Sequence, residues 1–312
     1  MTVYEAWVSQ HIPRQDGRTV IVTGANSGLG FEASKLLATR GARVILAVRN
    51  MMKGREALER ICDEVPAAQL ELLPLDLADL GSVGCFAEEV RWSQSKLHAL
   101  INNAGVMAIP QRSTVDGFEM QFGTNHLGHF ALTGLLLPLL LRTPDSRVVT
   151  VSSGIHVIGR INFDDLQSEE RYSDFPAYAQ SKLANLLFTY ELQRRFEQAG
   201  ARCCALAAHP GYASTNLQAV GPTMAQSKAR HFMMTLSNRL LAQTAAMGAL
   251  PLVYATTSPE ATGAEYYGPS GLFGQRGYPR VVKSSAATYD EAAAKRLWEV
   301  SEELTGVTYR FK

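Results

Sequence analysis

The sequence predicts an α/β fold in which a doubly wound parallel sheet lies between two layers of helices. Short β-branched apolar runs alternate with longer helical stretches between residues 19 and 207, which is the pattern of repeated βα units. Small or polar residues follow each of the apolar runs. The chain has 312 residues, of which 46% are hydrophobic, so it can bury one large core, and we expect a single domain over residues 1–312.

The first predicted βα unit follows a polar lead over residues 1–16 and carries a glycine-rich turn. Residues 19–23 are typical of a strand covered on both faces, and residues 31–40 of a helix that ends at Gly41. Glycines in the turn allow a pyrophosphate to approach backbone N–H groups at the positive helix N-terminus. The spacing G-x-x-x-G-x-G differs from the usual G-x-G-x-x-G, which leaves a flexible loop as the alternative. The candidate nucleotide-binding residues are Gly24, Asn26, Ser27, Gly28, Leu29 and Gly30.

The second predicted strand, residues 43–48, ends at Arg49. A dinucleotide-binding βαβ unit places the residue that meets the adenosine ribose at about this point. An Asp or Glu there would bind a free 2′-hydroxyl, whereas Arg49, Asn50 and Lys53 suit a 2′-phosphate. We therefore expect NADP(H) rather than NAD(H), with a solvated surface arginine as the alternative.

The alternation of strands and helices continues along the chain. Further strands are predicted over residues 70–75, 98–101, 147–151 and 202–207, and helices over residues 53–65, 80–92 and 116–141. Ligands of doubly wound sheets bind outside the carboxyl ends of the strands, so residues that follow strands should meet at one edge. These residues are Asp76 and Leu77, Asn103, Ala104 and Gly105, Ser152 and Ser153, and Pro210 and Gly211.

Tyr178 and Lys182 lie four residues apart in a predicted helix, so their side chains project from the same face. A neighbouring positive charge favours phenolate and moves the pKa of a tyrosine from about 10 towards neutral pH. The pair can therefore act as a proton-transfer device. Taken alone, such a pair is more often an aromatic contact beside a solvated lysine, so the other motifs decide its meaning.

The order and spacing of the motifs resemble the short-chain dehydrogenase/reductase superfamily over about residues 17–217. The resemblance rests on Thr23-Gly-x-x-x-Gly-x-Gly30, Asn102-Asn-Ala-Gly105, Asn125, Ser153, Tyr178-x-x-x-Lys182 and Pro210-Gly211. Within the superfamily, Asn125-His-Leu-Gly-His129 and Gln180-Ser-Lys-Leu-Ala-Asn185 are similar to the branch of retinol dehydrogenases and WW-domain oxidoreductases. The light-dependent protochlorophyllide reductases are close to that branch.

The resemblance implies a role for each polar residue. Tyr178 would be the general acid/base at the substrate oxygen, and Ser153 would hold that oxygen. Lys182 would lower the pKa of Tyr178 and bind the nicotinamide ribose, and Asn125 would anchor a water that links Lys182 to solvent. Thr215 would contact the nicotinamide carboxamide.

The region after the sixth predicted strand is expected to meet the substrate. Residues 218–250 are rich in Met, Ala and Leu, and a segment at this place commonly forms a lid over the substrate cleft in this superfamily. Methionine adapts to irregular apolar shapes, so we expect a bulky hydrophobic substrate, with a plain amphipathic helix as the alternative. The methionines concerned are Met224, Met233, Met234 and Met247. A helix over 247–258, a short strand at 265–267, an exposed loop over 268–283 and a C-terminal helix and tail over 288–312 complete the prediction.

Charge and composition argue against other classes of protein. A formal net charge of +1 provides no field that would attract nucleic acid. The four cysteines, the acidic loop around Asp164 and Glu169, and the pair His126 and His129 lack metal-ligand spacing, so no metal is expected. No stretch predicts a membrane span or an export signal, so we expect a cytoplasmic protein. The sequence is compatible with a homo-oligomer.

The leading hypothesis is an NADP(H)-dependent oxidoreductase that acts on a hydrophobic carbonyl or alcohol. A second enzyme class is reduction of a carbon–carbon double bond, as in the protochlorophyllide relatives. A dinucleotide sensor without turnover is the hypothesis from another class. Such sensors often lack the tyrosine or the lysine, and this chain retains both.

Overall fold

The computed structural model describes residues 2–211, 243–271 and 274–311, and one sheet lies at its centre. The strands are β1 (Thr19–Thr23), β2 (Arg43–Val48), β3 (Gln69–Pro74), β4 (Ala99–Asn102), β5 (Ser146–Val151), β6 (Cys203–Ala208), β7 (Tyr266–Pro269) and β8 (Pro279–Val281). Their order in space is β3-β2-β1-β4-β5-β6-β7-β8. All neighbours pair in parallel except β7 and β8, which are antiparallel. The predicted doubly wound parallel sheet is confirmed.

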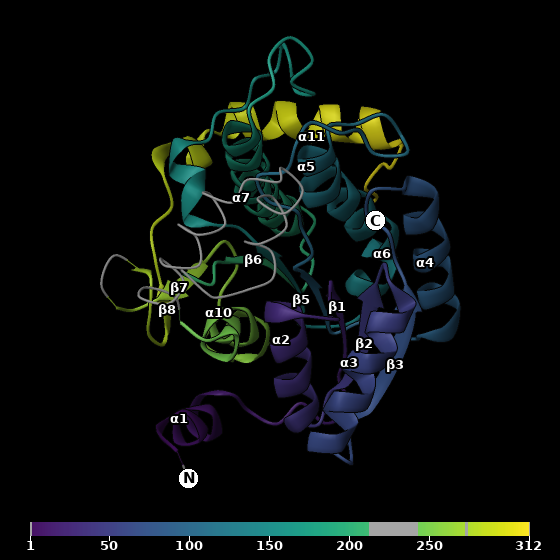
Figure 1. The fold of residues 1–312 in the computed structure, drawn as a ribbon, viewed down its shortest axis with the longest axis vertical. Helices are drawn as coiled ribbons and strands as arrows, with labels where there is room; N and C mark the ends of the chain where they lie inside the picture. Colours follow the sequence, from purple (N-terminus) through teal and green to yellow (C-terminus); the bar gives the residue numbers. More distant parts are fainter. Residues whose placement is uncertain (1, 212–242, 272–273, 312) are drawn as a thin grey trace.

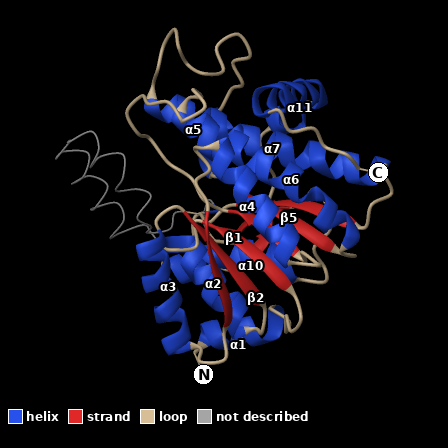
Figure 2. Cartoon of the chain, turned by 90° about the vertical axis from the view of Figure 1, so that its right-hand side faces the viewer, coloured by secondary structure: helices blue, strands red, loops and turns tan. Residues whose placement is uncertain are grey.

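Helices cover both faces of this sheet (Figures 1 and 2). They are α1 (Val3–His11), α2 (Gly28–Thr39), α3 (Met51–Glu64), α4 (Leu80–Ser93), α5 (Met120–Phe122), α6 (Gly128–Arg142), α7 (Asp174–Gln198), α10 (Ala245–Thr257) and α11 (Glu291–Thr305). Helices α2, α3 and α10 pack on one face, and α4, α6 and α7 on the other, where α11 lies against α7. Three layers result, as the sequence predicts.

The two cores explain why the central strands are mostly apolar. In β1, Val20 and Val22 belong to the core under α2 and α10, whereas Ile21 belongs to the core under α4 and α6. Successive side chains of a strand point to opposite faces, and here both faces are dry. Most positions of the inner strands are therefore apolar, and β1 carries its polar residues, Thr19 and Thr23, at its two ends.

Two parts of the predicted element pattern are wrong near the chain ends. The polar lead over residues 1–16 contains α1, which begins with a capping box formed by Thr2 and Glu5. The loop predicted over 268–283 contains β8, whose Val281 pairs with Tyr267. Trp7 of α1 stacks on Tyr278, the residue before β8, with ring centroids 4.8 Å apart, so α1 packs beside the start of this strand.

The helix predicted over residues 116–141 also differs in detail. It starts at Met120, passes through a π-helical turn, Gly123–Leu127, and continues as α6. In the π-helical turn the Gly128 amide donates to the Gly123 carbonyl, five residues back. Hydrophobic periodicity carries no signal for one extra residue in a turn, so the sequence could not show this feature.

Phe130 of α6 is the centre of the aromatic core that joins α6, α7 and α11. Its ring is fully buried and makes edge contacts with Phe188 at 5.6 Å and Trp298 at 5.1 Å between centroids. We expect Phe130→Ala to lower the free energy of unfolding by about 3–5 kcal/mol in urea titrations, because a large cavity opens. Trp92→Ala is the control, because Trp92 is 89% exposed and should change stability by less than about 0.5 kcal/mol. Equal effects of the two variants would contradict this packing.

Candidate active site

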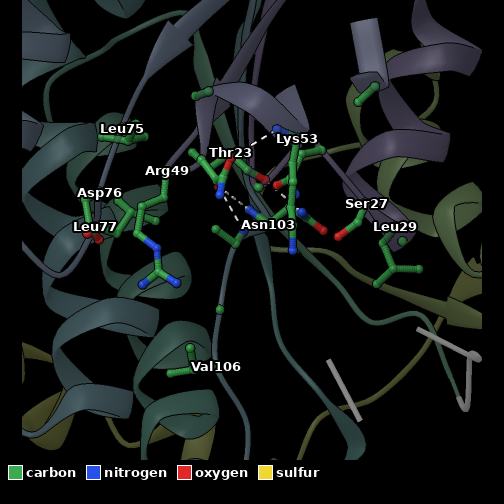
Figure 3. Close-up of a pocket in the computed structure, with 18 of the residues that line it drawn as sticks. Thr23, Ser27, Leu29, Arg49, Lys53, Leu75, Asp76, Leu77, Asn103 and Val106 are labelled. Carbon is green, nitrogen blue, oxygen red and sulfur yellow. Dashed lines mark hydrogen bonds between the residues drawn. The ribbon is translucent and has the colours of Figure 1, made fainter. Parts of the chain in front are cut away.

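The residues predicted to bind a nucleotide meet at the carboxyl edge of the sheet, where the strand order reverses between β1 and β4 (Figure 3). A cavity of about 630 Å³ opens there. Twelve of the predicted residues line it: Gly24, Asn26, Ser27, Gly28, Leu29, Arg49, Lys53, Asp76, Leu77, Asn103, Ala104 and Gly105. Gly30, Tyr178, Lys182, Pro210 and Gly211 do not line this cavity, and Thr215 lies outside the described residues.

The glycine turn has the shape that a phosphate needs. Gly24 and Gly28 have positive φ angles of 67° and 55°, which disfavour residues with a Cβ atom. A side chain at Gly30 would collide with the Gly24 backbone and with Asn103, so the helix N-terminus stays close to the strand end. Ser27 begins α2, but its hydroxyl does not cap its own helix. The hydroxyl and the first amides of α2 can therefore bind a pyrophosphate.

Thr23 ties the glycine turn to the loop after β4. Its hydroxyl oxygen accepts from the backbone amides of Asn103 and Ala104, both at 2.9 Å. The Asn103 side-chain amide donates back to the Thr23 carbonyl at 2.8 Å, and Figure 3 shows this pair. Thr23 was not among the predicted site residues, although its place at the end of β1 is the signal that could have indicated it.

Basic side chains surround the part of the cavity next to β2. Arg49 follows β2, and the Asn50 side chain caps α3 by accepting from the Lys53 amide at 3.0 Å. In Figure 3 the side chains of Arg49 and Lys53 extend in the same direction. In the part of the chain that is described, neither forms an ion pair with a carboxylate.

Arg60 is a lining residue that the sequence analysis missed. It lies two turns after Lys53 on α3, and its guanidinium stacks at 4.3 Å over the ring of Phe31, the residue that follows Gly30. The spacing of seven residues between Lys53 and Arg60 was the available signal. The cavity wall thus contains three cations.

Asp76 and Leu77 close the far side of the cavity after β3. The Asp76 carboxylate accepts from the Ala78 amide at 3.0 Å, and the Asp76 amide donates to the Ser82 hydroxyl at 2.9 Å. Any side chain at Gly128 would collide with the Leu77 carbonyl. This strand end is therefore held closely against α6.

Asn125 lies in the π-helical turn and is fully buried. Its side-chain oxygen accepts from the Val106 amide at 2.8 Å, and its side-chain nitrogen donates to the Val106 carbonyl and the Ser181 hydroxyl, both at 2.9 Å. Asn125 thus joins the loop after β4 to α7, next to Lys182. A side chain at Gly105 would come within 2.8 Å of the Asn125 oxygen, so a glycine is required there.

Tyr178 and Lys182 share the inner face of α7, as predicted, and both are buried. The Lys182 ammonium lies 5.7 Å from the Tyr178 ring centroid and donates to the Val151 carbonyl at 3.2 Å. Burial raises the pKa of Tyr178 to about 12, although a hydrogen bond with Ser153 opposes this rise. Burial also lowers the pKa of Lys182 to about 8. The expected lowering of the Tyr178 pKa by Lys182 is not seen, because the loss of hydration dominates both groups.

Ser153, and not Ser152, faces the tyrosine. Ser153 caps the 3-10 helix Gly154–Ile158, and its hydroxyl is the group that opposes the rise in the pKa of Tyr178. The Ser152 hydroxyl instead donates to the Lys182 carbonyl at 2.8 Å, which fixes α7 against β5. The role of Ser153 at the substrate oxygen stays a prediction.

The loop after β6 is fixed by a residue from the next described segment. The Gln243 side chain donates to the Pro210 carbonyl at 2.7 Å and accepts from the Gly277 amide at 3.2 Å. Most of the predicted lid, residues 218–242, lies outside the described residues, together with Met224, Met233 and Met234. Met247 lies in α10 and packs against the core.

Among the described residues, no group of three or more His, Cys, Asp or Glu side chains could hold a metal ion. Likewise, none of the described helices is both long and apolar enough to span a bilayer.

The fold and this site define a nucleotide-binding α/β protein whose buried tyrosine and lysine lie at the ligand edge of the sheet. The family model for short chain dehydrogenases matches residues 18–225, and the chain belongs to that family. It is 40% identical over 299 residues to polyprenol dehydrogenase of Homo sapiens, covering 95% of this chain and 87% of the relative. It is also 40% identical over 309 residues to retinol dehydrogenase 14 of Mus musculus, covering 93% and 86%. The chain is an oxidoreductase of the retinol dehydrogenase-like branch.

Solved structures share the fold of this chain. A protein of uncharacterised function from Mycobacterium paratuberculosis has a TM-score of 0.80 at 46% identity, covering 97% of this chain and 99% of its own. A short-chain dehydrogenase from Shigella flexneri, solved with NADP, has a TM-score of 0.61 at 23% identity, covering 82% and 98%. The second likeness shows the fold alone.

The buried Lys182 should weaken the fold that holds it. Its folded pKa of about 8 lies below the unfolded value, so its charge is disfavoured in the folded protein below pH 8. We expect Lys182→Met to raise the free energy of unfolding by about 1–3 kcal/mol at pH 7. This gain should shrink between pH 8 and about 10.5 as the wild-type lysine loses its proton. Urea titrations across this range measure it, and a less stable variant at pH 7 would contradict the burial cost.

Proposed function

We propose that this protein is an NADP(H)-dependent oxidoreductase that interconverts a hydrophobic carbonyl compound and its alcohol. The observation that carries the proposal is the buried Tyr178 with Ser153 beside it, one helical turn from Lys182, whose ammonium lies 5.7 Å from the Tyr178 ring centroid. A proton donor, a second hydrogen-bonding group and a cation thus meet beside a cavity suited to a dinucleotide.

The residues have distinct tasks in this reaction. During reduction the Tyr178 hydroxyl gives its proton to the substrate oxygen, while the Ser153 hydroxyl holds that oxygen; during oxidation the proton moves back. Bound NADP(H) supplies or accepts the hydride. A pKa of about 8 for Lys182 keeps much of its charge at neutral pH, where it favours phenolate once the proton leaves Tyr178.

The preference for NADP(H) rests on the cations beside β2. Arg49 and Lys53 line the cavity and form no ion pair within the described chain, so their charge is available to a 2′-phosphate. Arg60 adds a third positive charge at the same wall. The residue directly after β2 is Arg49, where an Asp or Glu would select a free 2′-hydroxyl.

The substrate is proposed to be a long apolar alcohol or aldehyde. The relatives carry the names retinol dehydrogenase and polyprenol dehydrogenase, and both named substrates are extended isoprenoid alcohols. The side chains of Val157 and Ile158 are exposed in the 3-10 helix that follows Ser153, and they offer apolar surface to such a substrate. Residues 218–250 as a lid, the cytoplasmic location and a homo-oligomer stay predictions.

Turnover of an aldehyde panel tests the proposal. The panel consists of retinal, farnesal, nonanal and benzaldehyde, each with NADPH and with NADH. We expect NADPH-dependent reduction that is fastest for the two isoprenoid aldehydes. Tyr178→Phe should lower kcat by at least about 10³-fold and leave the NADPH Kd within about threefold, because only the proton donor is removed.

Tyr190→Phe is the matched control for this variant. Tyr190 is also buried on α7, but its hydroxyl bonds Ser284 at 2.9 Å, and the variant should keep its activity. An active Tyr178→Phe enzyme would remove this tyrosine from the mechanism. A wild-type protein that binds NADPH without any turnover would favour the sensor hypothesis instead.

Replacement of Arg49 tests the cofactor preference. Arg49→Asp should weaken NADPH binding by about 10- to 100-fold, because a charged hydrogen bond to the 2′-phosphate becomes a repulsion. The NADH Kd should stay within about threefold. Arg55→Asp is the control, since Arg55 is exposed on α3 and does not line the cavity. Equal losses for NADPH and NADH in the Arg49 variant would contradict the 2′-phosphate assignment.

A further inference from the structure

His129 is a buried imidazole of α6 that touches two parts of the site. Its Nε2 lies 2.9 Å from the Thr23 hydroxyl in the turn that leads to the glycines. Its Nδ1 lies 3.0 Å from the backbone carbonyl of Asn125 in the π-helical turn. Only 1% of the residue is exposed, so both bonds form away from water. One ring therefore contacts the nucleotide side and the proton-transfer side of the site.

The hydrogen-bonding partners define which ring nitrogen carries the proton. The Asn125 carbonyl can only accept, so Nδ1 donates to it and Nε2 of the neutral ring accepts. Thr23 must then donate its hydroxyl hydrogen to Nε2. This is consistent with Thr23 itself, because the amides of Asn103 and Ala104 occupy its two lone pairs. The competing acceptor for the Thr23 hydrogen, the Ile101 carbonyl, is farther away at 3.3 Å.

The surroundings keep the ring in this neutral form. Burial lowers the pKa of His129 to about 4, and the positive charge of Lys182 on α7 acts in the same direction. A protonated ring would also place a second donor against Thr23, whose lone pairs are already used. The positive charge of Lys182 and the hydrogen bonds of Thr23 thus both favour the neutral imidazole of His129.

The bond to Asn125 matters because it lies where the helix departs from regular α geometry. In the π-helical turn the Gly128 amide bonds five residues back, to Gly123, so the carbonyls of this turn are displaced from their usual partners. His129 supplies a side-chain donor to the Asn125 carbonyl. The side chain of the same Asn125 holds Val106 and Ser181, next to Lys182.

We propose that His129 is a positioning residue that couples the seating of the dinucleotide at the Thr23 turn to the proton pathway through Asn125 and Lys182. The proposal rests on the proposed function, because both ends of the coupling belong to that reaction. Through Nε2 the ring orients the hydroxyl that holds Asn103 and Ala104 at the cavity wall. Through Nδ1 it orients the turn that carries Asn125.

Two substitutions can separate the two bonds of the ring. An asparagine side chain places its amide where Nδ1 lies, so His129→Asn should keep the bond to Asn125 and lose the bond to Thr23. A glutamine reaches the position of Nε2, so His129→Gln should keep the bond to Thr23 and lose the bond to Asn125. The pair therefore tests each half of the proposal.

The measurements are the NADPH Kd by fluorescence, the kcat for the panel aldehyde that the wild type reduces fastest, and the pH profile for oxidation of the matching alcohol. We expect His129→Asn to weaken NADPH about tenfold and to keep kcat within about threefold. For His129→Gln we expect an unchanged Kd and a kcat that falls about tenfold. In His129→Gln, the pH at which alcohol oxidation increases should be higher by about 0.5 unit or more than in the wild type, since the phenolate of Tyr178 is less well stabilised.

His126 provides the matched control. It lies one turn earlier in the same helical segment, is equally buried, and bonds Ser301 of α11 at 2.9 Å. His126→Asn and His126→Gln should lower the urea midpoint as much as the His129 variants do, without changing the NADPH Kd or the pH profile. Parallel urea titrations separate loss of fold from loss of coupling.

A purely structural role for His129 would overturn the proposal. It would appear as lower stability in both His129 variants with Kd, kcat and pH profile like the wild type.

If these variants do not fold, Thr23→Val tests the same link, because it removes the hydroxyl and leaves the ring. The proposal requires Thr23→Val to weaken NADPH about tenfold, as His129→Asn does, and Thr23→Ser to keep the wild-type Kd, because it keeps the hydroxyl. An unchanged Kd in Thr23→Val would overturn it. A wild-type protein that neither binds NADPH nor reduces any panel aldehyde would contradict the proposed function itself.

Discussion

The rest of the site depends on the burial of the ionisable pair Tyr178 and Lys182 at the carboxyl edge of the sheet. Lys182 is only 3% exposed, and the loss of its hydration lowers its pKa to about 8. Such a charge is tolerated only where surrounding structure supplies ample stability. The apolar cores on both faces of the sheet supply it, so the stability of the inner strands supports the burial of Tyr178 and Lys182 on α7.

The loops at this edge are held by side-chain hydrogen bonds from neighbouring elements. The Thr23 hydroxyl accepts hydrogen bonds from backbone amides of the loop after β4. Asn125 holds the next part of that loop against α7, and Gln243 holds the loop after β6. Loops are mobile unless their backbone groups find partners. Here the partners are buried, which lets a cavity of about 630 Å³ keep its shape.

Much of this architecture follows from local patterns. The strands β1 and β2 have the same bounds in prediction and structure, because continuous β-branched runs indicate strands with two dry faces. The helix α1 was missed although Thr2 and Glu5 form a capping box, a signal that was present in the sequence. The strand β8 spans only Pro279–Val281, which is too short for an alternating pattern to be seen. The π-helical turn at Asn125 adds no change of composition, so no local pattern could indicate it.

The sequence by itself determined the family, the sheet, and the identity of most groups at its carboxyl edge, because strand ends and glycine turns are local features. Only the tertiary structure decided their environments. Thr23 and His129 are 106 residues apart in the chain yet 2.9 Å apart in space, and no spacing rule connects them. The pKa values of Tyr178 and Lys182 likewise depend on burial, which arises only when distant segments pack together and exclude water.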